Sequence, residues 1–365
     1  MRHATIFRAP GRFAGWPANY GMWHFGDEIV VGFTVGAHRT AQRGHAIDKR
    51  QPVVNMQARS LDRGLTWRVE AFTGARPGGR GLSADEHMDE GSRLAEVMSA
   101  TTAAVPEAPL NFSQPDSALM LARTGLARGV FSFFYLSGDR CRTWAGPYRL
   151  PQFGSTGIAA RTNTIILGAH SALFFLTANK ADGKEGRVIC VRSDDGGHSF
   201  QLVSEVGGEP SETGDFAIMP ASLQLPSGRI LCACRCRQGA SGLSWIDLNA
   251  SDDQGRSWRF VNRPVAFQRA GHSGNPPCLK QLSDGRLLLI YGNRDGPYRI
   301  GARISEDEGG SWSGEIVLRA GGANGDMGYP RAVVLDDDSV VTAYYINERP
   351  DGDGERFIEA TVWRP

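Results

Sequence analysis

The sequence predicts an all-β fold, a β-propeller with six blades, and three observations support this prediction. An eight-residue turn motif occurs five times along the 365 residues. Between its copies lies a second recurring unit, in which two short apolar strands flank a turn rich in Asp, Ser and Gly. Forty-six glycines and 19 prolines supply the turns that a chain of short strands requires. Because radial repetition of four-stranded sheets forms a propeller, we expect one domain that spans residues 1–365.

The turn motif reads Ser-x-Asp-x-Gly-x-Thr/Ser-Trp. We expect its Asp to accept hydrogen bonds within the turn and its Gly to adopt a positive φ, while the aromatic residue packs on a neighbouring sheet. The motif is therefore interpreted as structural and not as catalytic. Its copies begin at Ser60, Ser137, Ser193, Ser251 and Ser305, with Cys141 in place of Gly in the second and Phe200 in place of Trp in the third.

The second unit gives the number of blades. Clear copies begin at Met219, Pro277 and Tyr329, a weaker one begins at Trp16, and degenerate copies span 111–136 and 157–177. A seven-bladed propeller and a β-helix are the alternatives, but six units can be counted, and motif starts 54 to 77 residues apart are too widely spaced for a β-helix coil. The surplus in the longest spacing predicts a short helical insertion near 80–105. The strand from Arg356 onward is expected to close the ring.

Composition excludes several classes of function. Forty basic residues, of which only four are Lys, balance 39 acidic ones, so binding of nucleic acid through bulk charge is not expected. No apolar run approaches the ~20 residues of a membrane span. The start of the sequence shows no hydrophobic leader, so we expect a cytoplasmic protein, or a secreted or periplasmic one if a leader was removed. The six cysteines lack zinc-site spacing and are expected to be buried, with no metal bound.

Five such turns, which are known as Asp boxes, on a six-bladed propeller resemble the sialidase (neuraminidase) superfamily. The resemblance covers essentially the whole chain. It implies a retaining, exo-α-sialidase-like glycoside hydrolase that acts on an acidic glycan and needs no cofactor. Asp boxes mark the repeat and not the activity, so the function depends on the site residues.

Three positions match the superfamily's catalytic pattern. The segment Asp326-Met-Gly-Tyr329-Pro resembles the strand that carries the nucleophilic Tyr, which makes Tyr329 the candidate nucleophile. The stretch from Gly228 to Arg235 resembles the strand that delivers one of three arginines to the substrate carboxylate. Asp48, twelve residues before the first box, resembles the acid/base Asp by its spacing.

Further candidates come from the starts of the inner strands, the ends of the strands that follow, and one loop, because these positions face the axis of a propeller. The candidates for holding the substrate are Arg294, Arg299, Arg39, Asp116, Asn275, Trp16 and the loop residue His45.

Two departures from the superfamily pattern matter. Trp16 stands where the first arginine of the triad is expected, in Gly-Trp-Pro instead of Arg-Ile-Pro. Strand spacing places Met219 where a carboxylate should take the proton of Tyr329. Glu212, Asp215 and Asp326 are the candidates to replace that carboxylate. These departures leave two alternatives open: a hydrolase or lyase of another acidic, uronate-containing glycan, and a propeller that binds glycans without catalysis.

Overall fold

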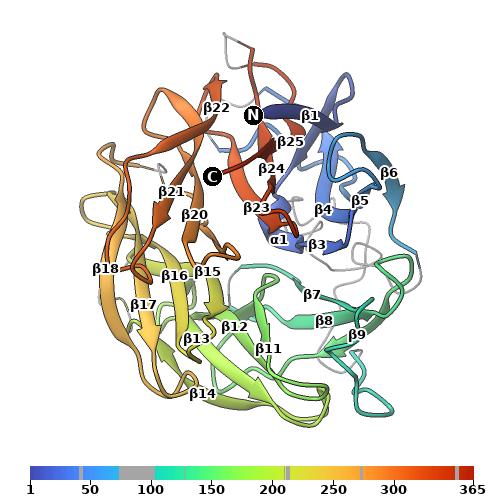
Figure 1. Ribbon diagram of the computed structural model, residues 1–365, viewed down its shortest axis with the longest axis vertical. Helices are drawn as coiled ribbons and strands as arrows, with labels where there is room; N and C mark the ends of the chain where they lie inside the picture. Colours follow the sequence, from blue (N-terminus) through green and yellow to red (C-terminus); the bar gives the residue numbers. More distant parts are fainter. Residues whose placement is uncertain are drawn as a thin grey trace.

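Six antiparallel sheets surround a common axis in the computed structural model, as Figure 1 shows. The structure describes residues 1–40, 44–73, 103–126, 128–208, 210, 214–271, 274–349 and 353–365. The prediction of an all-β, six-bladed propeller is confirmed. The expected helical insertion near 80–105 lies almost entirely outside the described residues. The one helix among the described residues is α1 (Pro17–Tyr20), a single turn that interrupts the inner edge of the first blade.

The first three blades contain thirteen strands. Blade 1 consists of β2 (Arg12–Gly15), β3 (Met22–Phe25), β4 (Glu28–Ala37), β5 (Val54–Ser60) and β6 (Arg68–Ala71). Blade 2 has β7 (Ala118–Arg123), β8 (Ser132–Ser137) and β9 (Ala145–Arg149). Blade 3 has β10 (Ile158–Ala159), β11 (Thr164–Ile166), β12 (Ala172–Asn179), β13 (Glu185–Ser193) and β14 (Gln201–Val206).

The other three blades have four strands each. Blade 4 consists of β15 (Phe216–Gln224), β16 (Ile230–Arg237), β17 (Ser244–Ser251) and β18 (Arg259–Ala266). Blade 5 has β19 (Cys278–Gln281), β20 (Leu287–Asn293), β21 (Tyr298–Ser305) and β22 (Ile316–Gly322). Blade 6 has β23 (Gly328–Val334), β24 (Val340–Ile346), β25 (Phe357–Trp363) and, from the other end of the chain, β1 (Arg2–Phe7).

Both ends of the chain close the ring. The C-terminal strand β25 is the third strand of blade 6 and pairs with β24. The N-terminal strand β1 then pairs with β25 and completes the blade as its outer strand. The expected closure by the C-terminal strand is therefore only half of the arrangement, since the outer edge comes from the N-terminus.

The Asp boxes lie at one end of the blades and give the molecule two different faces. In blade 4, β17 leads into the box and β18 leaves it, so the box lies opposite the end where β15 begins. Asp253 accepts hydrogen bonds from the hydroxyls of Ser251 (2.8 Å) and Ser257 (2.6 Å), as its motif predicts. Gly255 has a φ of +84°, and a Cβ atom there would lie 2.9 Å from the Cys190 sulfur in blade 3. Each such turn thus packs against the preceding blade.

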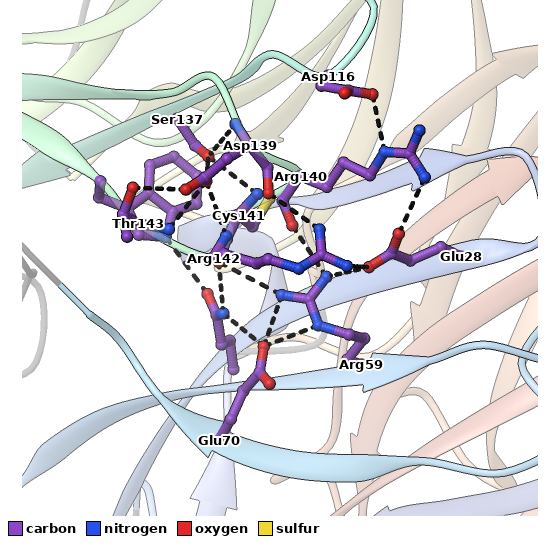
Figure 2. A network of polar contacts seen from close by, with 12 residues as sticks. Glu28, Arg59, Glu70, Asp116, Ser137, Asp139, Arg140, Cys141, Arg142 and Thr143 are labelled. Atoms are coloured by element: carbon purple, nitrogen blue, oxygen red, sulfur yellow. Dashed lines mark hydrogen bonds and ion pairs between the residues drawn. The ribbon is translucent and has the colours of Figure 1, made fainter.

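The box face also carries a network of charges between blades 1 and 2, which Figure 2 shows. Arg59 of β5 lies between Glu28 and Glu70 and also bonds to the backbone of the second Asp box. Arg140 of that box bonds to the carboxylate of Asp116 at 2.7 Å. This contact locates Asp116 on the box face.

The sequence-based assignment of strands in the segment 111–136 was therefore shifted by one strand. Its strands β7 and β8 were expected to be the inner pair of blade 2. Because β8 ends at Ser137, where the box begins, β7 and β8 are equivalent to the second and third strands of the other blades. Asp116, just before β7, consequently lies at the end of blade 2 that carries the Asp box. We expected it at the opposite end.

All six cysteines are buried and unbridged. Among the residues that the structure describes, no helix is long and apolar enough to cross a membrane. Over the same residues, no three His, Cys, Asp or Glu side chains lie close enough together to hold a metal ion.

Candidate functional site

Three residues at the axis share an unusual backbone conformation. Trp16, Met219 and Tyr329 have φ values of 62°, 52° and 51°, and each precedes a proline. A left-handed conformation costs a bulky residue about 1–3 kcal/mol and persists only where its surroundings impose it. Such strain gathers at functional sites, so these residues mark the face opposite the boxes as the place to look for a site.

The strand register shows that the three positions are equivalent. In each blade, the residue before the strained one pairs with the second strand at the same level. The pairs are Gly15 with Thr34, Ile218 with Arg235, and Gly328 with Tyr345. In blades 4 and 6 the inner strand then bulges by one residue. Met219 is therefore the blade 4 counterpart of Tyr329, and it brings a thioether to the position where a carboxylate was expected.

Two arginines lie against Tyr329. The guanidinium carbon of Arg294 lies 5.5 Å from the centre of the Tyr329 ring. Arg235 lies close enough for Tyr329 to raise the pKa of its guanidinium, and its Nη1 lies 3.9 Å from the Met219 sulfur. Among the described residues, no carboxylate lies within 4.0 Å of either guanidinium. The two guanidinium groups therefore have no carboxylate of the described residues in direct contact, and Glu185 raises the pKa of Arg235 only as a charge at a distance.

Burial makes this pair of charges costly. Arg235 is only 8% exposed, and its desolvation lowers the pKa of its guanidinium, an effect to which the positive charge of Arg294 adds. Arg294 is held in place because its Nε and Nη2 donate to the Met327 carbonyl, at 3.0 and 2.7 Å. Two buried cations side by side are unfavourable unless an anion compensates them. The arrangement suits a ligand with a carboxylate.

A histidine and an aspartate form a dyad beside the same tyrosine. His45 lies in the loop after β4, and its Nδ1 is 2.6 Å from Oδ1 of Asp326 in the loop before β23. The centre of the His45 ring is 4.9 Å from that of Trp16 and 6.5 Å from that of Tyr329. The side chain of His45 is 30% exposed, whereas that of Asp326 is 4% exposed. The dyad thus joins blade 1 to blade 6 at the level of the strained residues.

Three donors fix the Asp326 carboxylate. Arg356 Nε donates to it at 2.8 Å, the Tyr345 hydroxyl at 2.9 Å and the Ala46 amide at 2.9 Å. Burial alone would raise the pKa of Asp326, but His45, Arg356 and the Ala46 amide hold it far below the usual range. Asp326 therefore remains ionised and orients the imidazole.

Asp48 lies in the same loop as His45, and Arg39 lies next to that loop. Both residues contact other side chains than those around Tyr329. Arg50 binds the Asp48 carboxylate with two nitrogens, at 2.9 and 3.0 Å, and Arg39 lies 3.9 Å from it. The hydrogen bond from Arg50 is the main cause that lowers the pKa of Asp48. The side chain of Arg39 is largely exposed. No described contact joins either residue to Tyr329, Arg235 or Arg294.

The remaining sequence candidates separate into two groups. Asn275 belongs to the site, because its Oδ1 accepts a hydrogen bond from the Tyr329 amide at 2.8 Å. Asp215 accepts a bond from the Gly239 amide at 2.6 Å, in a pocket lined by residues of β15 to β17. Arg299 pairs with Glu315 in a separate cavity beside β21. Glu212 lies outside the described residues.

Sequence reasoning missed two members of the site, Tyr345 and Arg356. Tyr345 falls within an apolar strand and attracts no attention as a motif, although it occupies the same register in blade 6 as Arg235 does in blade 4. Arg356 was noticed only as the start of the closing strand, because its contact with Asp326 spans 30 residues. The repeat register could have found Tyr345, whereas no local signal identifies Arg356.

The chain matches one family model, and it matches no curated protein. The BNR repeat-like domain matches residues 107–342, which is more than half of the sequence. The match includes the inner strands that carry Met219 and Tyr329.

Several solved structures are similar. A Dyadobacter fermentans protein of unknown function aligns over 99% of this chain and 97% of its own, with 20% identity and a TM-score of 0.71. NanB sialidase from Streptococcus pneumoniae aligns over 99% and 70%, with 12% identity and a TM-score of 0.59. A Penicillium chrysogenum α-L-arabinanase aligns over 99% and 98%, with 11% identity and a TM-score of 0.61. At such identities these likenesses show the fold, and together with the repeat family they confirm the resemblance to a divergent sialidase-type propeller.

Proposed function

The chain belongs to the BNR repeat-like domain family, and we propose that it is a retaining glycoside hydrolase of acidic glycans. Its substrate would be a glycoconjugate with a terminal sialic acid or a related nonulosonic acid. One observation carries this proposal: Arg235 and Arg294 meet at Tyr329 without an acidic partner among the described residues. A sugar carboxylate supplies the missing charge and matches the planar fork of a guanidinium.

The reaction would use Tyr329 as nucleophile. With the sugar carboxylate on the two arginines, the anomeric carbon faces the phenolic oxygen, which attacks it as the glycosidic bond breaks. A neutral nucleophile suits this substrate because a carboxylate in its place would repel the carboxylate of the sugar. Water then releases the sugar from Tyr329 with net retention.

A panel of substrates tests the proposal. The protein is incubated with a fluorogenic α-sialoside and with uronic-acid oligosaccharides, alongside Tyr329→Phe and Arg235→Met variants. We expect turnover of the sialoside, a loss of at least about a thousandfold in kcat/KM for Tyr329→Phe, and about tenfold to a hundredfold weaker binding for Arg235→Met. His24→Gln, on the box face, is the matched control and should leave turnover unchanged. Turnover that survives Tyr329→Phe contradicts the mechanism.

A second function is favoured by a specific observation: Met219 offers no carboxylate, while a His–Asp dyad lies beside Tyr329. Two cations that neutralise a uronate carboxylate would acidify the neighbouring C–H, and His45 could remove that proton in an elimination. An unsaturated uronate product, seen by its ultraviolet absorbance, would identify this lyase activity. Binding of acidic glycans without turnover of any would identify a binding propeller instead.

A further inference from the structure

We propose that His45, oriented by Asp326, is the group that exchanges a proton with the glycosidic oxygen, in place of Asp48. This inference rests on the proposed function and assigns a role that the hydrolase needs. Asp48 is the sequence candidate for the same role, so the two residues compete for one assignment. The contacts around each residue distinguish them.

Asp48 is poorly suited to donate a proton. An acid that protonates a leaving group must carry a proton near neutral pH. The bidentate contact with Arg50 and the nearby Arg39 stabilise the ionised carboxylate and lower the pKa of Asp48. Asp48 therefore enters the reaction as a carboxylate without a proton to give.

Among the described residues, His45 is bound by a carboxylate and not by an arginine, and its side chain is 30% exposed. Its Nδ1 is committed to Asp326, so proton exchange would proceed through Nε2. The Asp326 carboxylate fixes the orientation of the ring through Nδ1, and Asp326 is itself held by Arg356 and Tyr345. The charged and titratable groups around the dyad are thus Asp326, Arg356, Tyr345 and Tyr329, with Arg294 bonded to the Tyr345 hydroxyl at 3.2 Å.

The position of His45 also fits the chemistry. In a retaining glycosidase the nucleophile and the acid/base flank one glycosidic bond, so their side chains must lie close together. The ring centres of His45 and Tyr329 are 6.5 Å apart, and the 4.9 Å contact with Trp16 holds the imidazole by an edge-to-face packing. His45 and Tyr329 can therefore act on the same bond from two sides.

The reaction takes two steps, and the enzyme neither gains nor loses a proton over the two. In the first, the Tyr329 oxygen bonds to the anomeric carbon and releases its proton to water, while the glycosidic bond breaks and its oxygen takes a proton from imidazolium His45. In the second, water attacks the anomeric carbon and gives a proton to neutral His45. The Tyr329 oxygen leaves and regains its proton from solvent, which restores the starting state of the enzyme.

Substrates with different leaving groups test the assignment. A general acid matters most for a poor leaving group and little for an acidic phenol. For His45→Ala we expect kcat/KM to fall about 10²- to 10⁴-fold on an alkyl glycoside of the acidic sugar. On an aryl glycoside with a strongly acidic phenol, the fall should be less than about tenfold. Added imidazole should restore part of the lost rate, which a merely structural role of His45 would not permit.

Matched variants separate the possible outcomes. Asp48→Asn should retain the leaving-group dependence of the wild type, and His24→Gln on the box face should change neither rate. Equal losses on both substrates for His45→Ala without rescue, or the expected pattern in Asp48→Asn instead, overturn the assignment and leave the proposed hydrolase standing. Absence of turnover by the wild-type chain on every acidic glycoside overturns the proposed function, and the assignment with it.

Discussion

At the scale of single residues, the site is defined by buried positive charges that no carboxylate of the described residues contacts. Arg59 and Arg235 both have little exposed surface, with 10% of the Arg59 side chain and 8% of Arg235 exposed, but only Arg59 lies between two carboxylates. Removing one partner of a buried ion pair destabilises a fold, whereas an unpaired buried cation is itself a cost in stability. The contrast between these residues separates a structural arginine from a functional one without a substrate at hand.

This contrast predicts opposite effects of the same substitution. We expect Arg235→Met to leave the free energy of unfolding unchanged or to raise it by up to about 2 kcal/mol, because it removes an unpaired buried charge. Arg59→Met should lower it by up to about 3 kcal/mol, because Glu70 would lose its arginine and Glu28 would keep only the more exposed Arg140 and Arg142. Chemical denaturation of both variants measures the two values. A large destabilisation by Arg235→Met would mean that Arg235 is structural.

Only part of the site could be predicted at this scale. Tyr329 and Arg235 were found by resemblance and Arg294 by its place at the end of a strand, and the strand register explains why Tyr329 and Arg235 lie at the same end of their blades. The contact of His45 with Asp326 spans 281 residues, so no local pattern reveals it. Asp48 satisfied the spacing to the first box, but spacing could not show that Arg50 binds its carboxylate.

At the scale of elements, the Asp boxes fasten neighbouring blades. The box glycine of blade 5, Gly309, has a φ of +89°, and a Cβ atom there would lie 2.5 Å from Leu248 in blade 4. A Cβ atom on Gly197 would likewise approach Phe134 in blade 2, and a Cβ atom on Gly64 would approach Val341 in blade 6. In the second box, Cys141 adopts a φ of 62° without being glycine, and its side chain is fully buried. The motif therefore conserves turn geometry while tolerating a buried side chain.

The box carboxylates predict how stability depends on pH. Hydrogen bonds from Ser257 and Ser251 lower the pKa of Asp253 from 3.8 to about 2. Since the folded carboxyl holds its proton more weakly than the unfolded one, its stabilising contribution is complete above the unfolded pKa and is lost as pH falls through about 2. We expect Asp253→Asn to unfold at a lower temperature than the wild type near neutral pH, with a difference that narrows as pH falls below about 4.

Thermal unfolding across this pH range checks the prediction. Glu306→Gln, at an exposed, variable position of the next box, provides the control and should follow the wild type at every pH. A difference for Asp253→Asn that stays constant from neutral to acidic pH would mean that the charge of Asp253 does not contribute.

At the scale of the whole molecule, repetition made the fold predictable but also led to a wrong strand assignment in blade 2. The five boxes and the apolar units were enough to predict six blades, because most repeats contain a recognisable turn sequence. In blade 2 the unit at 111–136 was read as the inner pair of strands, which placed Asp116 at the axis. The box at Ser137 would have corrected this, since β8 runs directly into it. Ring closure by β1 was missed because Arg2–Phe7 carries no repeat signal.

The same scale explains why the site lies where it does. The boxes occupy one face, and the strained residues Trp16, Met219 and Tyr329 converge from blades 1, 4 and 6 on the other. The ring of blades brings together side chains from distant parts of the chain, among them Arg235 and His45. A polar site built from three or more blades depends on the closed ring for its geometry.

The most direct test of the central claim is to identify the residue that becomes glycosylated. The protein is incubated with an acidic glycosyl fluoride that carries a second fluorine beside the anomeric carbon, which slows release of the sugar, and its peptides are analysed by mass spectrometry. We predict one sugar residue on the peptide that contains Tyr329, and none in Tyr329→Phe. Turnover without any adduct, or an adduct on another residue, would contradict the account.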